Sequence, residues 1–425
     1  MHELNNKFKN KKILIYGYGK SGISSFKYLK KNNDVFIFDD KKKIKNSYFI
    51  SFKNLKKKVF DYILVSPGID LKKCGLKKYL FKFKKKIITD LDIFYCENIN
   101  NLKIAITGTN GKSTTTELLF RILKSHRMDV RMLGNIGKPM LGEKNIKPST
   151  LFVIEVSSYQ IDYSKYFNAD HTIILNLTPD HLERHGSIYK YAHAKFKLIL
   201  NQDNKSYAYI EENNKYLNSE LRKYKVKSKI IKVKKNNIKS IKKKIYNPYF
   251  RTINNLHNLS FIIELGKKIK LNKKIILKTV NSFNGLIYRQ QIILNKKKIT
   301  IINDSKSTSF SSSLNLLKTY KNIFWIVGGL AKKGDRFLLP KRYYKNINCY
   351  IYGTNKSFFI NVFKKKLKFQ LFDKLSQIVK KIKIDSIYKE NINIIFSPAA
   401  ASFDQFSNFE HRGRYFNSLI KKYKF

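Results

Sequence analysis

The chain has 425 residues, of which 43% are hydrophobic and 14% aromatic, enough apolar material for about two to four packed domains of roughly 100–200 residues each. Its formal net charge of +58 would ordinarily favour a nucleic-acid or anionic-membrane partner. The basic residues are spread over the whole chain, however, and Asn, Ile, Phe and Tyr are abundant with them, as expected of an A/T-rich coding sequence. We therefore interpret the lysines mainly as solvated surface and expect no specific nucleic-acid partner.

Cysteine usage and hydropathy favour the cytoplasm. Cys74, Cys96 and Cys349 are far apart in the sequence, and this spacing argues against a disulfide framework or a zinc site. Residues 1–12 lead directly into a strand without the apolar region of a signal peptide. No apolar run approaches the ~18 residues of a membrane span. We expect a cytoplasmic monomer without a membrane partner.

In the first part of the chain, short apolar runs alternate with helical stretches. Residues 13–16 (ILIY) are expected to form a strand, followed by a glycine-rich turn and a helix that ends near residue 31. Further strands are expected at VFIF (35–38), YILVSPGI (62–69) and residues 87–89. Strands that alternate with helices form parallel sheets, which bind their ligands at the carboxyl ends of the strands.

The same alternation restarts twice further along the chain. A second set of strands is expected at KIAITGTNGKS, TLFVIEVSS and HTIILNLTPDH, and a third at TIINDSKS, IFWIVGG, CYIYG and INIIFSPAAASFDQF. The lysine- and asparagine-rich residues 213–244 carry no chemistry that we can assign. We predict an α/β protein of three successive domains at residues 1–91, 92–285 and 286–425, of which the first and third are Rossmann-like.

The glycine-rich turn of the first domain has the form G-x-G-x-x-G, with glycines at Gly17, Gly19 and Gly22 and an acidic residue about twenty residues later. Such glycines let the backbone approach a pyrophosphate at the start of a helix. The motif alone leaves three alternatives open: a site for NAD, a site for another diphosphate, or a tight turn without a ligand.

A second loop, residues 106–113 (ITGTNGKS), joins a strand end to a helical run. The common nucleotide loop, G-x-x-x-x-G-K-[ST], would put a glycine where Ile106 stands. Here the first glycine is Gly108, three residues before Gly111. Lys112 can reach a terminal phosphate and Ser113 can hold Mg²⁺, so a phosphate site is predicted nevertheless. Polar residues follow on neighbouring predicted elements: Glu155 and His181 at strand ends, and Lys195 on the next helix.

Several stretches carry a resemblance to a known family. The segment Thr107–Ser113 (TGTNGKS) resembles the loop of the Mur ligases, ATP-dependent amide ligases of peptidoglycan precursor synthesis, in which the displaced glycine is a family trait. Further matching motifs are SPGI (66–69), GNIG (134–137), TPDHLERHG (178–186), NDSKST (303–308) and SPAAASFDQFSNFEHRG (397–413). The last motif discriminates best among members that add different amino acids, and it favours D-glutamate.

The resemblance implies a role for each predicted domain. Residues 1–91 would bind a UDP-sugar, residues 92–285 would form a central P-loop ATPase domain, and residues 286–425 would bind the incoming amino acid. The implied UDP-sugar contacts are Lys20, Ser21, Asp39, Asp40, Ser66, Pro67, Gly68 and Asn135. The implied ATP contacts are Gly108, Thr109, Asn110, Gly111, Lys112, Ser113, Thr114, Asn255, Asn258, Arg289 and Asp304. The implied Mg²⁺ ligands are Ser113, Glu155, His181 and Lys195, and the implied D-glutamate contacts are Lys306, Thr308, Lys332 (beside Lys333), Ser402 and Phe409.

The implied substrates are UDP-N-acetylmuramoyl-L-alanine, D-glutamate and ATP, with Mg²⁺ as cofactor. ATP would phosphorylate the alanyl carboxylate, and the amine of D-glutamate would then displace phosphate. The expected catalytic residues are Lys112, His181 and Lys195. Lys112 would neutralise charge on the transferred phosphoryl group, and Lys195 would be carbamylated so that it offers Mg²⁺ an anionic oxygen.

Two departures from the family's pattern lie beside the expected nucleotide site. Asn254 stands where the family's H-N-x-x-N has its histidine, and Ile287 and Tyr288 replace the proline and histidine of G-L-P-H-R. Two alternatives also remain at this point. One is a sister ligase that adds another amino acid or extends folate with glutamate, and the more remote one is a basic nucleic-acid-binding ATPase.

Overall fold

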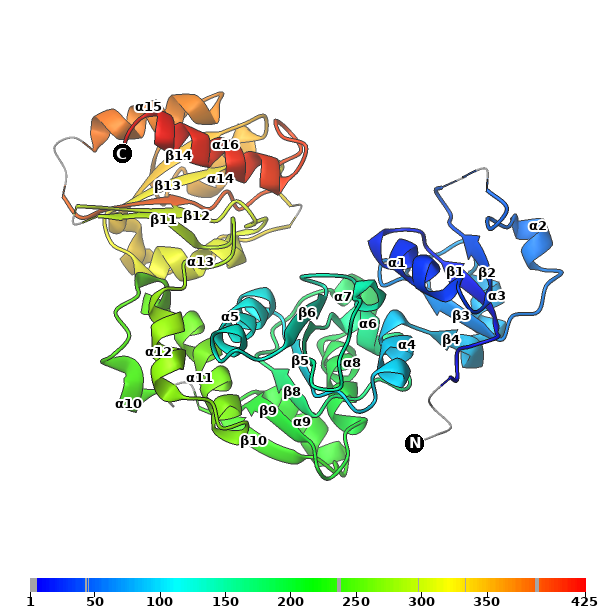
Figure 1. Ribbon diagram of the computed structural model, residues 1–425. Helices are drawn as coiled ribbons and strands as arrows, with labels where there is room; N and C mark the ends of the chain where they lie inside the picture. The colour runs from blue at the N-terminus through cyan, green and yellow to red at the C-terminus, as the bar shows by residue number, and fades with distance from the viewer. Residues whose placement is uncertain are drawn as a thin grey trace. The chain divides into compact units, whose positions relative to one another are not determined.

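The structure is a computed structural model that describes residues 6–42, 44, 46–234, 238–296, 298–332, 334–386 and 390–425. It contains three sheets in chain order, each accompanied by helices (Figure 1). By compactness the chain divides into unit 1, formed by Met1–Lys242 and His257–Thr279, and unit 2, formed by Lys243–Leu256 and Val280–Phe425. The first two sheets belong to unit 1 and the third belongs to unit 2.

The first sheet is parallel and has the order β2-β1-β3-β4. Its strands are β1 (Lys12–Tyr16), β2 (Asp34–Phe38), β3 (Tyr62–Val65) and β4 (Ile87–Ile88), and its helices are α1 (Lys20–Leu29), α2 (Phe52–Leu55) and α3 (Lys77–Lys82). Ile13 and Ile15 of β1 join one hydrophobic cluster, whereas Leu14 and Tyr16 join another. The central strand is therefore apolar throughout because both of its faces are covered.

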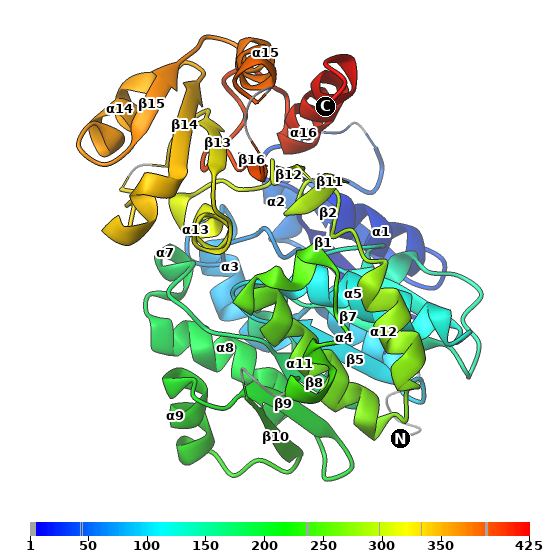
Figure 2. The ribbon, with the colours of Figure 1, turned by 90° about the vertical axis from the view of Figure 1, so that its left-hand side faces the viewer.

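The second sheet is also parallel and has the order β10-β9-β8-β5-β7-β6. Its strands are β5 (Lys103–Thr107), β6 (Val130–Gly134), β7 (Leu151–Glu155), β8 (His171–Ile174), β9 (Tyr207–Glu211) and β10 (Lys229–Val233). Its helices are α5 (Lys112–Ser125), α6 (Ser158–Tyr163), α7 (Leu182–His185), α8 (Ile188–Leu200), α9 (Lys215–Lys223) and α10 (Lys239–Lys242). Helix α8 packs against α6, α7 and α9, and Figure 2 shows α7, α8 and α9 together on one side of the second sheet. Because β8, β5 and β7 are neighbours, the segments that follow them meet at one edge of the sheet.

The third sheet, in unit 2, has the order β11-β12-β16-β13-β14-β15 and is parallel except for the edge pair β11–β12. Its strands are β11 (Gln291–Lys296), β12 (Ile299–Asn303), β13 (Ile323–Gly328), β14 (Ile347–Tyr352), β15 (Lys368–Leu371) and β16 (Ile392–Phe396). Helices α13 (Phe310–Thr319), α14 (Lys356–Phe363), α15 (Leu375–Asp385) and α16 (Phe409–Lys422) accompany it. Trp325, the single tryptophan of the chain, lies buried in the centre of this unit's core.

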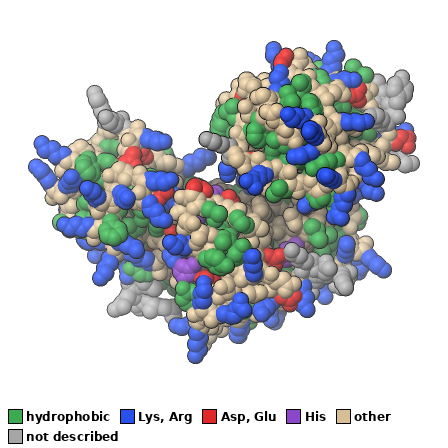
Figure 3. Space-filling view, turned by 180° about the vertical axis from the view of Figure 1, so that it is seen from behind, with side chains coloured by type: hydrophobic (Ala, Val, Ile, Leu, Met, Phe, Trp, Pro, Cys, Tyr) green, Lys and Arg blue, Asp and Glu red, His purple; other side chains and the backbone are tan. Residues whose placement is uncertain are grey.

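Helices α11 (Ile253–Lys268) and α12 (Lys273–Asn281) lie where the chain passes between the two units. Among the described residues, no helix has both the length and the apolar character needed to cross a membrane. On the face shown in Figure 3, lysine and arginine side chains are scattered rather than gathered in one patch, as expected for a solvated basic surface.

The expected α/β fold with three successive sheets is confirmed. The segment to which no chemistry was assigned, residues 213–244, contains α9, β10 and α10 in its described part. The domain limits 1–91, 92–285 and 286–425 stay a prediction.

The carboxylate of Asp92 joins the helix between the first and second sheets to a segment of the second sheet's domain. Asp92 lies on α4 (Asp90–Glu97) and is fully buried. Its Oδ1 accepts hydrogen bonds from Ser164 Oγ at 2.7 Å and from the backbone N–H groups of Lys165 and Tyr166, both at 2.8 Å. Its Oδ2 accepts from the N–H of Thr89 at 2.8 Å. One side chain thus holds the segment after α6 against α4.

We expect Asp92→Asn to lower the free energy of unfolding of unit 1 by about 3 kcal/mol, because an amide NH₂ would face backbone donors that now bind a carboxylate. Urea unfolding followed by circular dichroism measures this change, while Trp325 fluorescence, which reports unit 2, should keep its midpoint. The matched control is Asp61→Asn, since this exposed carboxylate accepts from the N–H of Lys12 at 2.7 Å. Equal midpoints for Asp92→Asn and the control would contradict the prediction.

Candidate functional site

The phosphate loop follows β5 and ends where α5 begins at Lys112. Gly108 and Gly111 have φ values of +150° and +84°, which side chains rarely adopt, so glycine is required at both positions. A Cβ at residue 111 would lie 2.3 Å from Asn258 Nδ2, so this part of the loop closes tightly on α11. Lys112 Nζ donates to the carbonyls of Gly108 and Thr109, each at 2.8 Å. The displaced first glycine therefore belongs to an intact, closed loop.

The segment after β8 braces this loop from the side. Asn176 Oδ1 accepts from the N–H of Asn110 at 2.9 Å, and Asn176 Nδ2 donates to the carbonyl of the same residue at 2.9 Å. Thr109 Oγ1 accepts from the N–H of Thr178 at 3.1 Å. Sequence reasoning assigned no role to Asn176, although an asparagine at a strand's carboxyl end beside a phosphate loop is a signal that could have found it.

Glu155 ends β7 and is almost fully buried. Its Oε1 accepts from Asn135 Nδ2 at 2.8 Å, so the structure brings together two residues that the motifs assign to different ligands. Within the described part of the chain, Glu155 Oε2 is buried without a hydrogen-bond partner. An unsatisfied buried carboxylate oxygen is costly unless a cation or donor occupies the site, so this oxygen suits a hard metal ion.

Lys195 lies on the face of α8 that packs against the phosphate loop and is 1% exposed. Its Nζ donates to Thr107 Oγ1 at 3.1 Å and lies 4.8 Å from the centre of the Tyr191 ring. Burial holds the pKa of this amine well below its usual range, and the charge of Lys112 lowers the pKa further. The neutral amine, which is the form that adds CO₂, is therefore favoured.

His181 precedes α7 in a left-handed backbone conformation, with φ of +53°. Its Nε2 lies 3.5 Å from Asp180 Oδ2, and its Nδ1 lies 3.7 Å from Glu183 Oε1. The imidazole ring lies 6.3 Å from the Tyr191 ring. Tyr191, whose hydroxyl is 3.2 Å from Thr109 Oγ1, is thus the residue that the phosphate loop, Lys195 and His181 share.

Asn135, which follows β6, lies on the second sheet, whereas the other residues expected to bind a UDP-sugar lie at the carboxyl edge of the first sheet. Most of these make internal hydrogen bonds. Ser21 Oγ donates to Asp90, Asp40 accepts from the hydroxyl of Tyr16 at 2.6 Å, and Ser66 Oγ donates to Gly17 O at 2.7 Å. Asp39 accepts from the N–H of Tyr18 at 2.6 Å. Lys20 and Gly68 are exposed, and Pro67 is partly exposed.

Two of the three glycines in the first motif are required by the fold. Gly17 has φ of +96°, and a Cβ at residue 22 would lie 2.0 Å from Gly17 O because α1 packs directly on the turn. A Cβ on Gly19 would meet nothing within 4 Å. The tight-turn alternative therefore accounts for Gly17 and Gly22 without a ligand, and Gly19 leaves open space above the turn.

In unit 2, Asp304 is the centre of a buried polar network. Asp304 accepts from Ser397 Oγ at 2.7 Å and from the N–H of Gln290 at 3.0 Å. Burial raises the pKa of this carboxyl to about 7, although the Ser397 bond and the charges of Arg289 and Arg412 lower it. Asn255, on the unit 2 part of α11, donates through Nδ2 to Tyr249 O at 2.8 Å.

Of the residues expected to hold D-glutamate, Lys306 and Phe409 are in contact, since Lys306 Nζ lies 4.0 Å from the centre of the Phe409 ring. Burial, followed by the charge of Arg289, lowers the pKa of Lys306. Ser402 is buried, whereas Thr308 and Lys332 are exposed. Lys333 lies outside the described residues.

Comparison with known proteins decides the family. Proteins named UDP-N-acetylmuramoylalanine–D-glutamate ligase from Rickettsia prowazekii (34% identical, 98% of this chain and 99% of that protein) and Francisella tularensis subsp. novicida (33% identical, 98% and 97%) align over nearly their full lengths. Residues 106–280 match the model of the Mur ligase middle domain. The chain belongs to the Mur ligase family.

Solved Mur ligases share this fold at low sequence identity. The UDP-N-acetylmuramate-alanine ligase of Thermotoga maritima superposes with a TM-score of 0.57 at 18% identity, covering 98% of this chain and 100% of that one. The MurF ligase of the same organism, solved with ADP, gives 0.59 at 14% identity, covering 99% and 97%. These matches confirm the three-sheet architecture.

Within this Mur ligase, Arg412 connects the two motifs of unit 2. The guanidinium is fully buried, and its Nη2 donates to the carbonyls of Ser305 at 2.7 Å and Ala400 at 3.0 Å. Its Nε donates to Ser305 Oγ at 3.1 Å. The motif was recognised in the sequence, but the positioning role of its arginine was not, because it depends on which two loops meet.

Of the residues that depart from the family pattern, Tyr288 is packed against a helix, whereas Asn254 and Ile287 are exposed. Tyr288 has φ of +61°, and a Cβ at residue 413 would lie 2.4 Å from its ring, so the tyrosine packs flush against α16. Asn254 is exposed on α11, and Ile287 is 65% exposed. The tyrosine is thus accommodated by a glycine opposite it.

We expect the stability of Asp304→Asn, relative to the parent, to improve as pH rises from about 5 to about 8. The folded-state pKa of Asp304 is raised from its ordinary 3.8 to about 7, so the stability that this carboxyl contributes is present at low pH and is lost as pH rises through about 7. Asparagine avoids this loss, which takes place mainly between about pH 5 and about pH 7 and amounts to about 3 kcal/mol.

Urea unfolding followed by Trp325 fluorescence measures the difference, since Trp325 Nε1 donates to Ser397 O at 2.8 Å within the same network. The control is Asp373→Asn. In the parent, a bond to Lys356 holds the pKa of the Asp373 carboxyl below its usual value, so no such trend between about pH 5 and about pH 8 is expected. A pH-independent difference for Asp304→Asn would contradict the assignment.

Proposed function

We propose that the chain is an ATP-dependent, ADP-forming ligase that adds D-glutamate to UDP-N-acetylmuramoyl-L-alanine in peptidoglycan precursor synthesis. The observation that carries this proposal is that relatives bearing this enzyme's name align over 97–99% of their own length, with identities of 33% and 34% for two of them. The closing motif, residues 397–413, supports the same amino acid. Because UDP-sugars and ATP are made in the cytoplasm, the reaction belongs there.

In the proposed reaction, the terminal phosphoryl group of ATP passes to an oxygen of the alanyl carboxylate, forming an acyl phosphate and ADP. The amine of D-glutamate attacks the carbonyl carbon, loses a proton and expels phosphate. The chain's contribution is positioning and charge neutralisation: the closed loop with Lys112 holds the phosphates, and Asn176 keeps that loop rigid.

The residues at the carboxyl edge of the second sheet fit a magnesium ion. Glu155 Oε2 is buried and unsatisfied, and Ser113, His181 and a carbamylated Lys195 would supply the other protein ligands. A carbamate on Lys195 would add a second anionic oxygen to that of Glu155, and a hard cation favours such ligands. Bound Mg²⁺ supplies neutralisation of negative charge on the phosphates.

For D-glutamate, we propose the pocket formed by Lys306, Thr308, Lys332, Ser402 and Phe409. An amino acid with two carboxylates requires cations and hydroxyl donors, and these residue types supply both. Lys306 is the strongest candidate, because it is half-buried and fixed against the ring of Phe409. For the UDP-sugar, we propose the loops of residues 17–22, 39–40 and 66–68 together with Asn135.

We expect phosphate release to require both UDP-N-acetylmuramoyl-L-alanine and D-glutamate, with L-glutamate and meso-diaminopimelate giving little turnover. The reason is that a site built for two carboxylates at fixed positions leaves charges unpaired when the stereochemistry or the side chain is wrong. A coupled phosphate-release assay over a panel of amino acids measures this. Equal turnover with a diamino acid would instead identify a sister ligase.

We expect Lys195→Ala to lose at least about 99% of its activity while still binding ATP, because a carboxylate-like metal ligand is removed and the phosphate loop is not. Added acetate should restore part of the activity by filling the space with a carboxylate. The control is Lys190→Ala, an exposed lysine on another face of the same helix, which should keep full activity. Near-normal turnover of Lys195→Ala would show that another group binds the metal.

A further inference from the structure

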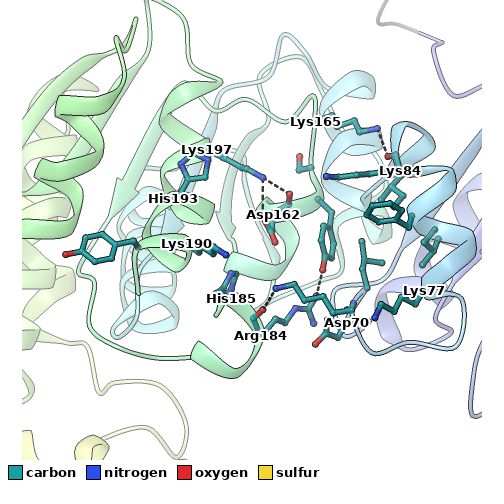
Figure 4. Close-up of a pocket in the computed structure, with 18 of the residues that line it drawn as sticks. Asp70, Lys77, Lys84, Asp162, Lys165, Arg184, His185, Lys190, His193 and Lys197 are labelled. Atoms are coloured by element: carbon teal, nitrogen blue, oxygen red, sulfur yellow. Dashed lines mark hydrogen bonds and ion pairs between the residues drawn. The ribbon is translucent and has the colours of Figure 1, made fainter. Parts of the chain in front are cut away.

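A cavity of about 1140 Å³ lies in unit 1 between α3 and the helices α6, α8 and α9. Figure 4 shows His193, Lys190 and Lys197 of α8 reaching it from one side and Lys77 and Lys84 from the other. This volume is slightly larger than the range that is usual for small-molecule sites, roughly 300–1,000 Å³.

None of the residues assigned above to ATP, Mg²⁺, the UDP-sugar or D-glutamate lines this cavity. Helix α8 explains the separation, because its residues 190, 193 and 197 share one face at helical spacing while Lys195 points from another. The catalytic side of α8 and the cavity side are thus two surfaces of one helix.

The cavity carries an excess of positive charge that the protein does not neutralise. Its lining contains nine lysine and arginine side chains and three carboxylates. Two of the carboxylates are already paired, Asp162 with Lys197 at 3.2 Å and Glu220 with His193 at 2.8 Å. In the described part of the chain, no carboxylate pairs with Lys77, Lys78, Lys84 or Lys190.

Positive charge alone would not distinguish this cavity in so basic a chain. Its apolar and aromatic walls do distinguish it. Leu80 and Ile87 are buried beneath it, and Phe81 at its edge is 82% exposed. Tyr189 and Tyr224 are exposed aromatic residues on the opposite side. Unpaired cations around low-dielectric walls strengthen the local positive potential, and exposed aromatic faces leave apolar surface to be covered.

The two walls are held in place by reciprocal hydrogen bonds. Arg184 Nη2, from α7, donates to Ile69 O at 2.7 Å, and Lys72 Nζ donates back to Arg184 O at 3.2 Å. The guanidinium carbon of Arg184 lies 4.0 Å from the centre of the Tyr159 ring. The cavity is therefore preformed.

We propose that this cavity binds a small amphipathic anion, an organic molecule with an apolar or aromatic body and a phosphate, sulfonate or carboxylate head. The head would neutralise the unpaired lysines, and the body would cover the exposed rings of Phe81 and Tyr189. A flat membrane surface fits less well, because these groups surround a concavity between helices of two sheets.

The test uses the full chain and the fluorescent probe 8-anilinonaphthalene-1-sulfonate, with octyl phosphate and inorganic phosphate as competitors. Lys78→Glu/Lys190→Glu should weaken probe binding at least about tenfold, since two attractive charges become repulsive. The control Lys53→Glu/Lys57→Glu changes net charge equally at exposed positions outside the cavity and should change binding less than about twofold.

For the apolar wall, Phe81→Ala should weaken binding, while Val59→Ala, 74% exposed and outside the cavity, should not. Octyl phosphate should displace the probe far better than inorganic phosphate. Three outcomes would overturn the proposal: equal weakening by the control pair, equal competition by inorganic phosphate, and binding only to phosphatidylglycerol vesicles.

Discussion

Burying the amine of Lys195 against Thr107, at the carboxyl end of the central strand β5, determines how the surrounding chain must be arranged. An ammonium ion at this depth beside Lys112 would be repelled and poorly solvated, so the site favours the neutral amine. Tyr191 packs one helical turn away and contacts both the phosphate loop and Lys195. A single helix, α8, therefore sets the distance between the nucleotide loop and the proposed metal ligands.

The scarcity of acidic residues makes their placement informative. The chain has 29 carboxylate side chains against 87 lysines and arginines, yet Asp92, Asp304 and Glu155 are all buried. Asp92 and Asp304 each accept several hydrogen bonds and join segments that are distant in sequence. Glu155 differs, because one of its oxygens is left unsatisfied. A carboxylate that accepts many bonds acts as structural support, whereas one with a free buried oxygen is suited to a cation.

Unlike the buried carboxylates, most lysines of this chain are on the surface and in contact with water. Lysine side chains can stay solvated at their tips while their stems cover apolar surface, so a high lysine content costs the fold little. Where lysines surround an apolar cavity, however, water solvates and screens their charges less well. The cavity between α3 and α8 is such a place, and it lies on the opposite face of the helix that carries Lys195.

The sequence by itself determined the three α/β sets, the phosphate loop and the family, because strand–helix alternation and glycines at positive φ are local features that leave a record in consecutive residues. Only the tertiary structure decided which neighbours complete the site. Asn176, Tyr191 and Arg412 have ordinary local sequences, and their roles arise from the strand order β8-β5-β7 and from the meeting of two loops in unit 2. Sheet order and side-chain convergence depend on contacts between residues far apart in the chain, and no local pattern encodes them.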